Sequence, residues 1–295
     1  MARTAEEERQ RRLIHDYFGE DARIRLLRPA PTFGASLFVV DFDRGARHYR
    51  TLGSFGASFE KTAVTWFGNS LQVTEQSSMD LLYPAQLVFH YERLMSLAFA
   101  LVERPVTALL LGVGGAAMWR FMRAYLPDCA PTLVDADEAI VSIARRWFYL
   151  TQPVTVEPAQ QFVAATTQRF DAVLVDLYNS AGPAESNELF WTRCLDALNP
   201  GGCLANNWAD FSVNPAVRPM ADALAAVAQA RGLGPIYVTR RGFRDNLVQY
   251  VPSEPGVTAE AITDVHARFV LEHRPPDRGR GILENCVVTT RFPID

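Results

Sequence analysis

The chain has 295 residues, enough for one large domain or for one domain with a smaller companion. Its 29 basic and 33 acidic residues give a formal net charge of −4. No basic stripe is interleaved with aromatic residues, so a nucleic-acid binder is not expected. Scattered cysteines and histidines predict no metal site, and apolar runs well short of about 20 residues predict no membrane span. Without an apolar N-terminal signal, the expectation is a cytoplasmic protein with reduced thiols.

The N-terminal part is predicted to combine one helix with a small antiparallel sheet. The segment from Ala5 to Phe18 is charged and has one apolar edge, which indicates an amphipathic helix. This edge is formed by Leu13, Ile14, Tyr17 and Phe18. Short runs rich in β-branched and aromatic residues follow at Leu37–Phe42, His48–Leu52, Ala63–Phe67 and Leu71–Thr74. Because turn residues separate these runs, they predict hairpins. An N-terminal helix and β-hairpin domain is therefore expected over residues 1–80.

The rest of the chain, residues 81–295, alternates between apolar strands and helical segments. The predicted helices are Pro84–Val102, Ala116–Tyr125, Glu138–Tyr149, Pro158–Thr166, Glu185–Leu198, Ala216–Arg231 and Ala259–Leu271. The predicted strands are Thr107–Leu111, Thr132–Val134, Val154–Val156, Ala172–Val175, Cys203–Asn206, Ile236–Thr239 and Leu247–Val251. Such alternation is typical of an α/β fold with a doubly wound, mostly parallel, Rossmann-like sheet. The last two strands follow each other directly, so they are predicted to be antiparallel, and a loop-rich tail is expected after the final helix.

A glycine-rich run marks the predicted ligand site. The residues from Gly112 to Ala117 read Gly-Val-Gly-Gly-Ala-Ala, follow an apolar strand and open a helix. Glycines let the backbone approach a ligand closely, and the N–H groups at a helix start bind polar ligand atoms. Asp135 follows about twenty residues later, where an acid binds ribose hydroxyls in such folds. A nucleotide site is predicted at Gly112, Gly114, Gly115, Asp135 and Ala136. The run by itself also fits a dinucleotide site or a tight turn without a ligand.

Features later in the chain indicate which kind of cofactor the glycine-rich run would bind. The segment Phe170–Asp176 is an apolar strand that ends in an acid at the ligand edge of the sheet. The residues Asn199-Pro200-Gly201-Gly202 then precede the next strand. This arrangement resembles class I methyltransferase-fold proteins and is unusual in nicotinamide enzymes. A methyltransferase-type sheet that binds S-adenosylmethionine or a derivative is therefore expected.

A narrower resemblance, covering about Gly34 to Val251, is to the spermidine synthases, or polyamine aminopropyltransferases. As in that family, a hairpin-rich domain precedes the nucleotide core, and residues 84–95 resemble the helix before the glycine loop. The segment Asp176–Glu185 resembles the family's D-S-S-D-P-x-G-P-A-E loop, which covers the site and carries the catalytic aspartate.

The resemblance implies roles for individual residues. Asp176 matches the catalytic acid, and Tyr178 or Tyr91 would orient the nitrogen of an amine substrate. A carboxylate beside a desolvated ammonium group can accept its proton, which fits this role for Asp176. The remaining candidates are Glu157 and Gln160 near the adenine, and Glu92, Asn179, Trp208 and Asp210 near the substrate. For Trp208, packing in the core is the alternative interpretation.

The sequence also departs from the family pattern. The family's glycine loop reads G-G-G-D-G, and its aspartate, which holds the amine of decarboxylated S-adenosylmethionine, is replaced by Gly115. The second aspartate of D-S-S-D is Asn179, and the family's acid near the adenine falls near Pro158.

Three functional hypotheses follow. The first is aminopropyl transfer from decarboxylated S-adenosylmethionine to a small amine, without a metal. The second is methyl transfer to a small molecule from intact S-adenosylmethionine, which Gly115 favours because a cofactor carboxylate would not be repelled. The third is a non-catalytic relative, against which the retention of Asp135 and Asp176 argues. Family members commonly dimerise, so a homodimer is expected.

Overall fold

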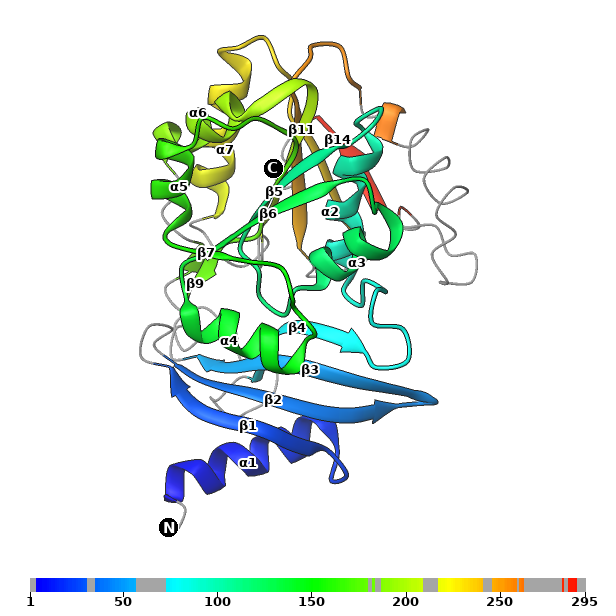
Figure 1. Cartoon of the computed structure of the whole chain (residues 1–295), viewed down its shortest axis with the longest axis vertical. Coiled ribbons are helices and arrows are strands. Elements are labelled where there is room, and N and C mark those ends of the chain that lie inside the picture. Colours follow the sequence, from blue (N-terminus) through cyan, green and yellow to red (C-terminus); the bar gives the residue numbers. More distant parts are fainter. Residues whose placement is uncertain are drawn as a thin grey trace.

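The structure is a computed structural model that describes residues 4–30, 35–56, 73–179, 182–183, 187–208, 217–240, 246–258, 260–262, 283 and 286–290. Two large sheets dominate it (Figure 1). A four-stranded antiparallel sheet with helix α1 forms the lower part of the view, and a larger α/β unit lies above it.

The N-terminal sheet contains β1 (Arg23–Ala30), β2 (Ala35–Arg44), β3 (Arg47–Gly56) and β4 (Val73–Asp80), paired in that order and all antiparallel. Helix α1 spans Ala5–Phe18, as predicted. The sequence prediction missed β1, because its arginines interrupt the alternation that identifies a strand. The predicted run Ala63–Phe67 lies outside the described residues, and the run at Leu71–Thr74 overlaps only the start of β4.

This sheet is covered on both faces. Successive side chains of a strand point to opposite faces, so Phe38 and Val40 pack with Ile14 and Phe18 of α1. On the opposite face, residues such as Leu37 pack against helix α4 (Glu138–Trp147), through an apolar cluster that includes Ile140, Ile143 and Phe148. The N-terminal sheet is therefore packed directly against the larger unit.

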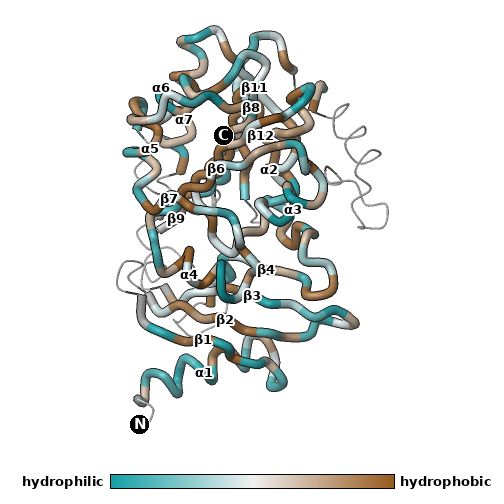
Figure 2. Tube along the Cα trace, viewed as in Figure 1, coloured by the Kyte–Doolittle hydropathy of each residue, from teal (hydrophilic) through white to brown (hydrophobic). Residues whose placement is uncertain are grey.

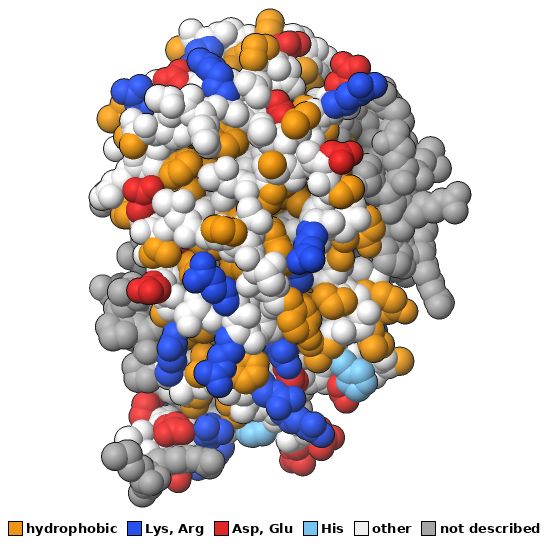
Figure 3. All heavy atoms as spheres, viewed as in Figure 1, with side chains coloured by type: hydrophobic (Ala, Val, Ile, Leu, Met, Phe, Trp, Pro, Cys, Tyr) orange, Lys and Arg blue, Asp and Glu red, His pale blue; other side chains and the backbone are white. Residues whose placement is uncertain are grey.

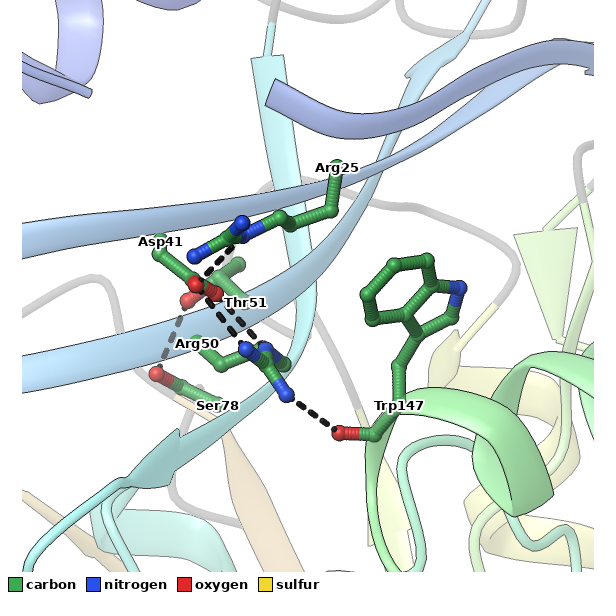
Figure 4. Close-up of polar contacts among 6 residues, drawn as sticks. All are labelled: Arg25, Asp41, Arg50, Thr51, Ser78 and Trp147. Carbon is green, nitrogen blue, oxygen red and sulfur yellow. Dashed lines mark hydrogen bonds and ion pairs between the residues drawn. The ribbon is translucent and has the colours of Figure 1, made fainter. Parts of the chain in front are cut away.

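A group of charged residues reinforces the contact with α4 (Figure 4). The carboxylate of Asp41 accepts hydrogen bonds from Nε and Nη2 of Arg50, at 2.6 and 2.8 Å, and from Nε of Arg25, at 2.7 Å. Arg50 also donates to the carbonyl of Trp147, at 3.1 Å. Burial favours a higher pKa for Asp41, but the hydrogen bonds and charges of Arg50 and Arg25 outweigh it and lower that pKa. Basic side chains gather over this part of the surface (Figure 3).

The larger sheet has, within the described residues, the strand order β14-β12-β13-β11-β8-β5-β6-β7. Its strands are β5 (Thr107–Leu111), β6 (Ala130–Asp135), β7 (Thr155–Val156), β8 (Phe170–Val175), β11 (Leu198–Trp208), β12 (Ile236–Arg240), β13 (Leu247–Pro252) and β14 (Cys286–Thr289). The pairs from β7 to β11 are parallel, and β13, β12 and β14 continue the sheet with antiparallel pairing. The predicted doubly wound, mostly parallel sheet is confirmed. Strand β14 corrects the prediction of a tail made only of loops.

Helices lie on both faces of this sheet. They are α2 (His90–Ala100), α3 (Ala117–Tyr125), α5 (Ala159–Ala165), α6 (Glu188–Asp196) and α7 (Val217–Gln229), besides α4. Residues of α2 and α3 belong to the apolar cluster on one face, and residues of α5, α6 and α7 to the cluster on the other. Figure 2 shows the hydrophobic residues concentrated in the strands between them. Among the described helices, none is long and apolar enough to cross a membrane.

Two helix predictions need correction or lie outside the structure. Helix α2 begins at His90 and not at Pro84, because the carboxylate of Glu92 binds the backbone N–H of Phe89 and caps the helix there. Of the predicted helix Ala259–Leu271, residues 260–262 are helical and the others lie outside the described residues.

Candidate functional site

A pocket lies where the glycine loop meets helix α2, strand β8 and strand β4. The loop follows β5, and the pocket is lined by Gln76, Ser77, Tyr91, Glu92, Met95, Leu110, Gly112, Val113, Gly114, Ala117, Met118, Leu174 and Asp176. Predicted site residues from three separate segments thus meet: the loop glycines, the first turn of α2 and the end of β8. Gln76 and Ser77, from the N-terminal sheet, were not predicted, because nothing in their local sequence indicates a ligand site.

Gly112 fixes the distance between the glycine loop and the end of β8. The backbone N–H of Gly112 binds the carbonyl of Val134, and that of Asp176 binds the carbonyl of Leu111, both at 2.9 Å. Gly112 has a φ of +90°, and a Cβ there would lie 2.2 Å from the backbone oxygen of Asp176. Only glycine allows this conformation and this close approach. The glycine loop and Asp176 are therefore brought together by the backbone itself.

Asp135, at the end of β6, holds the glycine loop from the other side. Its Oδ2 accepts the N–H of Val113 at 2.8 Å, and its Oδ1 accepts the N–H of Asp137 at 2.9 Å. Burial raises its pKa, although these backbone hydrogen bonds act in the opposite direction. The neighbouring Ala136 is exposed. Asp135 therefore orders the loop, and the contact of both residues with a ribose remains a prediction.

The packing around Gly115 explains why this chain lacks the aspartate of the family's glycine loop. A Cβ at this position would lie 2.5 Å from Oγ and 2.7 Å from Cβ of Ser77. Ser77 is buried on β4, so the N-terminal sheet fills the space that a side chain at position 115 would need. The aspartate of the family's G-G-G-D-G loop does not fit here without a rearrangement of β4 or of the loop.

Asp176 has two polar side-chain partners. Nδ2 of Asn207, on β11, donates to its Oδ1 at 2.8 Å, and the hydroxyl of Tyr91 also donates to the carboxylate. Burial raises the pKa of Asp176, more than these hydrogen bonds lower it. Burial also raises the pKa of Tyr91, and the charges of Asp176 and Glu92 raise it further. A neutral phenol thus faces a carboxylate with increased basicity, which is suited to accepting a proton.

Glu92 is a second acid in the pocket wall. Its side chain is 5% exposed, and its Oε2 accepts the N–H of Phe89 at 3.0 Å. Burial raises its pKa to about 8, while the positive charge of Arg120 acts in the opposite direction. Asp176 contributes to the increase because two negative charges in one pocket repel each other.

Arg120, on α3, is a residue that the sequence prediction missed. Its guanidinium donates to the carbonyl of Pro84 at 2.7 Å, to that of Phe148 at 3.1 Å, and to that of Gly115. One buried cation therefore connects the glycine loop with two other segments. Asn207 was missed as well, although its place directly after the predicted fifth strand, at the ligand edge, was a usable signal.

The other predicted site residues lie elsewhere or outside the structure. Trp208 is buried on the opposite face of the sheet, where its indole N–H binds Oε1 of Gln249 at 2.8 Å, as in the core-packing alternative. Glu157 and Gln160 are partly buried beside the start of α5 and do not line the pocket. Asp210 lies outside the described residues. Tyr178 and Asn179 form strand β9, which pairs with β10 (Gly182–Pro183), and their side chains are not described.

The strand order and the glycine loop define a class I methyltransferase fold. Human methyltransferase-like protein 13, solved in complex with SAH, aligns with a TM-score of 0.52 at 18% identity, over 65% of this chain and 95% of that protein. A spermidine synthase solved with the transition-state analogue AdoDATO aligns with a TM-score of 0.57 at 12% identity, over 85% and 78%. The predicted fold class is thereby confirmed.

Curated relatives make the resemblance more specific. A polyamine aminopropyltransferase of Chromobacterium violaceum is 32% identical over 142 residues, 46% of this chain and 54% of that protein. One of Neisseria meningitidis serogroup A is 29% identical over 177 residues, 55% of this chain and 67% of that protein. The chain thus matches about half to two thirds of the length of these relatives. No family model matches the chain. The resemblance to polyamine aminopropyltransferases is confirmed at about 30% identity.

Proposed function

We propose that this protein transfers an aminopropyl group from decarboxylated S-adenosylmethionine to a small amine. The observation that carries the proposal is the carboxylate of Asp176, hydrogen-bonded by Tyr91 and Asn207, at the carboxyl end of β8 and beside the glycine loop. The names of the curated relatives support the same reaction.

The reaction requires positioning and the removal of a proton. A bond forms between the acceptor nitrogen and the carbon of the aminopropyl chain that is attached to the sulfonium sulfur. The bond between that carbon and sulfur breaks, which leaves a neutral thioether. A free amine has a pKa near 10, so the acceptor arrives protonated. Asp176 would accept this proton, because burial has raised its pKa, while Tyr91 and Asn207 hold the carboxylate in place. The pocket would hold the reacting groups close together, which lowers the entropic cost of the reaction.

The residues present fit the nucleoside end of the donor. The backbone at Gly112 and Gly114 forms part of the pocket wall, and Asp135 holds the loop in shape. Asp135 and Ala136 would lie at the ribose, and Glu157 with Gln160 at the adenine. The glycine loop itself offers no acid for the donor's amine, because Ser77 fills the space beside Gly115.

Replacing Asp176 with Asn tests the proposal. With decarboxylated S-adenosylmethionine and a diamine, release of 5′-methylthioadenosine should fall by about a thousandfold, while calorimetric binding of the donor is retained. Asp222→Asn is a suitable control, because Asp222 is exposed on α7 and bonds only Arg218 among the described contacts. Unchanged turnover in the Asp176 variant would remove this residue from the mechanism. Turnover of intact S-adenosylmethionine alone would favour methyl transfer instead.

A further inference from the structure

We propose that Glu92 of helix α2 binds the ammonium group of the aminopropyl donor, a task for which the glycine loop of this chain has no carboxylate. This inference rests on the proposed function and assigns the residue that selects the decarboxylated donor over a donor bearing a carboxylate.

For the proposed reaction, the pocket must hold the positive charges of both substrates. The donor brings a sulfonium and an ammonium group, and the acceptor amine brings a further positive charge. Buried charges are stable only when opposite charges or hydrogen bonds compensate them. Among the described residues, two carboxylates line the pocket, those of Glu92 and Asp176. Asp176 is engaged by Tyr91 and Asn207 at the end of β8 and serves the acceptor, which leaves Glu92 for the donor.

Position 115 in the glycine loop has no room for an acidic side chain. A side chain at Gly115 would meet both Oγ and Cβ of Ser77 at less than 3.0 Å, and Ser77 is 4% exposed. Both Ser77 and Glu92 line the same pocket. The carboxylate of Glu92 therefore lies in the wall of the same pocket as the blocked loop position.

One carboxylate oxygen of Glu92 is held by the backbone of the helix start. Within the described residues, only Oε2 of Glu92 has a hydrogen-bond partner, the N–H of Phe89, so the side chain is fixed and Oε1 is available. Arg120 and Arg93 are the nearby cations. The guanidinium of Arg120 donates to the carbonyls of Pro84, Gly115 and Phe148, and that of Arg93 donates to the carbonyl of Val88. A glutamine at position 92 would cap the helix equally well, so the cap alone does not explain a buried acid here.

Two ligands that differ in the aminopropyl chain and in the charge on sulfur test the inference. Decarboxylated S-adenosylmethionine carries an ammonium group and a sulfonium, and 5′-methylthioadenosine has the same nucleoside with a neutral thioether and no ammonium group. In Glu92→Gln, we expect binding of the former to weaken at least tenfold by calorimetry, and binding of the latter to change less than twofold. Glu75→Gln is the matched control, because Glu75 is a partly buried acid on β4 that contacts Tyr17, Thr51 and Arg44, outside the pocket lining. It should change neither affinity.

Each outcome bears on the inference. Equal weakening of both ligands would show that Glu92 acts only as a helix cap, and unchanged binding of both would show that it contacts neither; either result overturns the inference. If the wild-type protein binds 5′-methylthioadenosine but not decarboxylated S-adenosylmethionine, the proposed function itself fails. If the wild-type protein binds both ligands and the Glu92→Gln variant binds both with unchanged affinity, only the assignment of Glu92 fails.

A measurement on the wild-type protein does not depend on the folding of the variant. Because Glu92 is mostly protonated at pH 7, pairing with an ammonium group should release close to one proton, measured by calorimetry in two buffers of different ionisation enthalpy. The other charged or titratable groups near Glu92 are Asp176 from β8, Arg120 from α3, and Tyr91 and Arg93 on α2. 5′-Methylthioadenosine should release no proton. Equal proton release with both ligands, or none with either, would overturn the inference.

Discussion

The carboxylates in two regions of this protein have pKa values that are shifted in opposite directions. One region is the contact between the N-terminal sheet and α4, and the other is the pocket. At the contact, Asp41 is bound by two arginines, and its pKa is lowered although it is buried. In the pocket, burial raises the pKa of Asp176 and Glu92, and it also raises that of Asp135 behind the glycine loop. The partners of these acids are mostly backbone N–H groups or neutral side chains. Ionised Asp41 stabilises the fold, whereas ionisation of the pocket acids destabilises it. The pocket therefore holds acids whose ionisation costs stability in the free protein and would be favoured by a cationic ligand.

The largest expected effect concerns the backbone of the pocket. Gly112→Ala should destabilise the protein by about 3 kcal/mol or more, because a Cβ would overlap the backbone oxygen of Asp176 and φ is positive. Gly114→Ala is the matched control, with a φ of +49° and no atom within 4 Å of the added Cβ, and should cost about 1 kcal/mol. Chemical denaturation measures both. Equal losses would show that φ, and not the close approach, determines the requirement for Gly112.

The next effect is at the contact with α4. Asp41→Asn should cost about 2–3 kcal/mol near pH 7, because it leaves Arg50 and Arg25 without their shared carboxylate. Since the folded-state pKa of Asp41 is lowered, its contribution is complete above the unfolded pKa of about 3.9 and is lost as pH falls through the folded pKa. The difference in denaturation midpoint between wild type and variant should therefore shrink below about pH 4. A difference that stays constant as the pH falls below about 4 would contradict this account.

In the pocket, the sign is reversed. The pKa of Glu92 is raised to about 8, so its favourable contribution, present below the unfolded pKa, is lost as pH rises through the folded pKa. Glu92→Gln should therefore gain thermal stability relative to wild type between pH 5 and 9, by about 1–2 kcal/mol at the upper end. Thermal unfolding across this range measures the difference. A variant less stable than wild type at pH 8 would show that the ionised carboxylate of Glu92 stabilises the buried charge of Arg120.

The smallest expected effect tests the hydrogen bond to Asp176. Asn207→Ala removes a donor that lowers the pKa of this carboxyl, so the acid limb of the turnover profile should move to higher pH and turnover at pH 6 should fall about fivefold. Asn199→Ala is the control, because Asn199 makes an equivalent 2.8 Å bond to Asp171 at the opposite end of β8. Its pH profile should match that of wild type. A shift in both variants would indicate a general change in β8.

Local sequence patterns predicted the regular elements well. Helix α1 and strand β5 have the predicted limits, because each has a clear apolar period and clear ends. The glycine loop, Asp135 and Asp176 were predicted from their places at strand ends and at a helix start. The role of Tyr91 was implied only by the family resemblance, because the predicted helix began at Pro84. The strands without such a pattern, β1 and β14, were missed, because sheet pairing with distant residues stabilises them.

The sequence by itself determined the class of fold, the position of the glycine loop and the acids at the ends of β6 and β8, because the chain direction of a parallel sheet places these ends at one edge. It also contained Gly115 in place of an acid, without a reason for it. Only the tertiary structure decided that Ser77 fills this position and that Arg120 binds three separate segments. These contacts join residues far apart in the chain, and no local period encodes them.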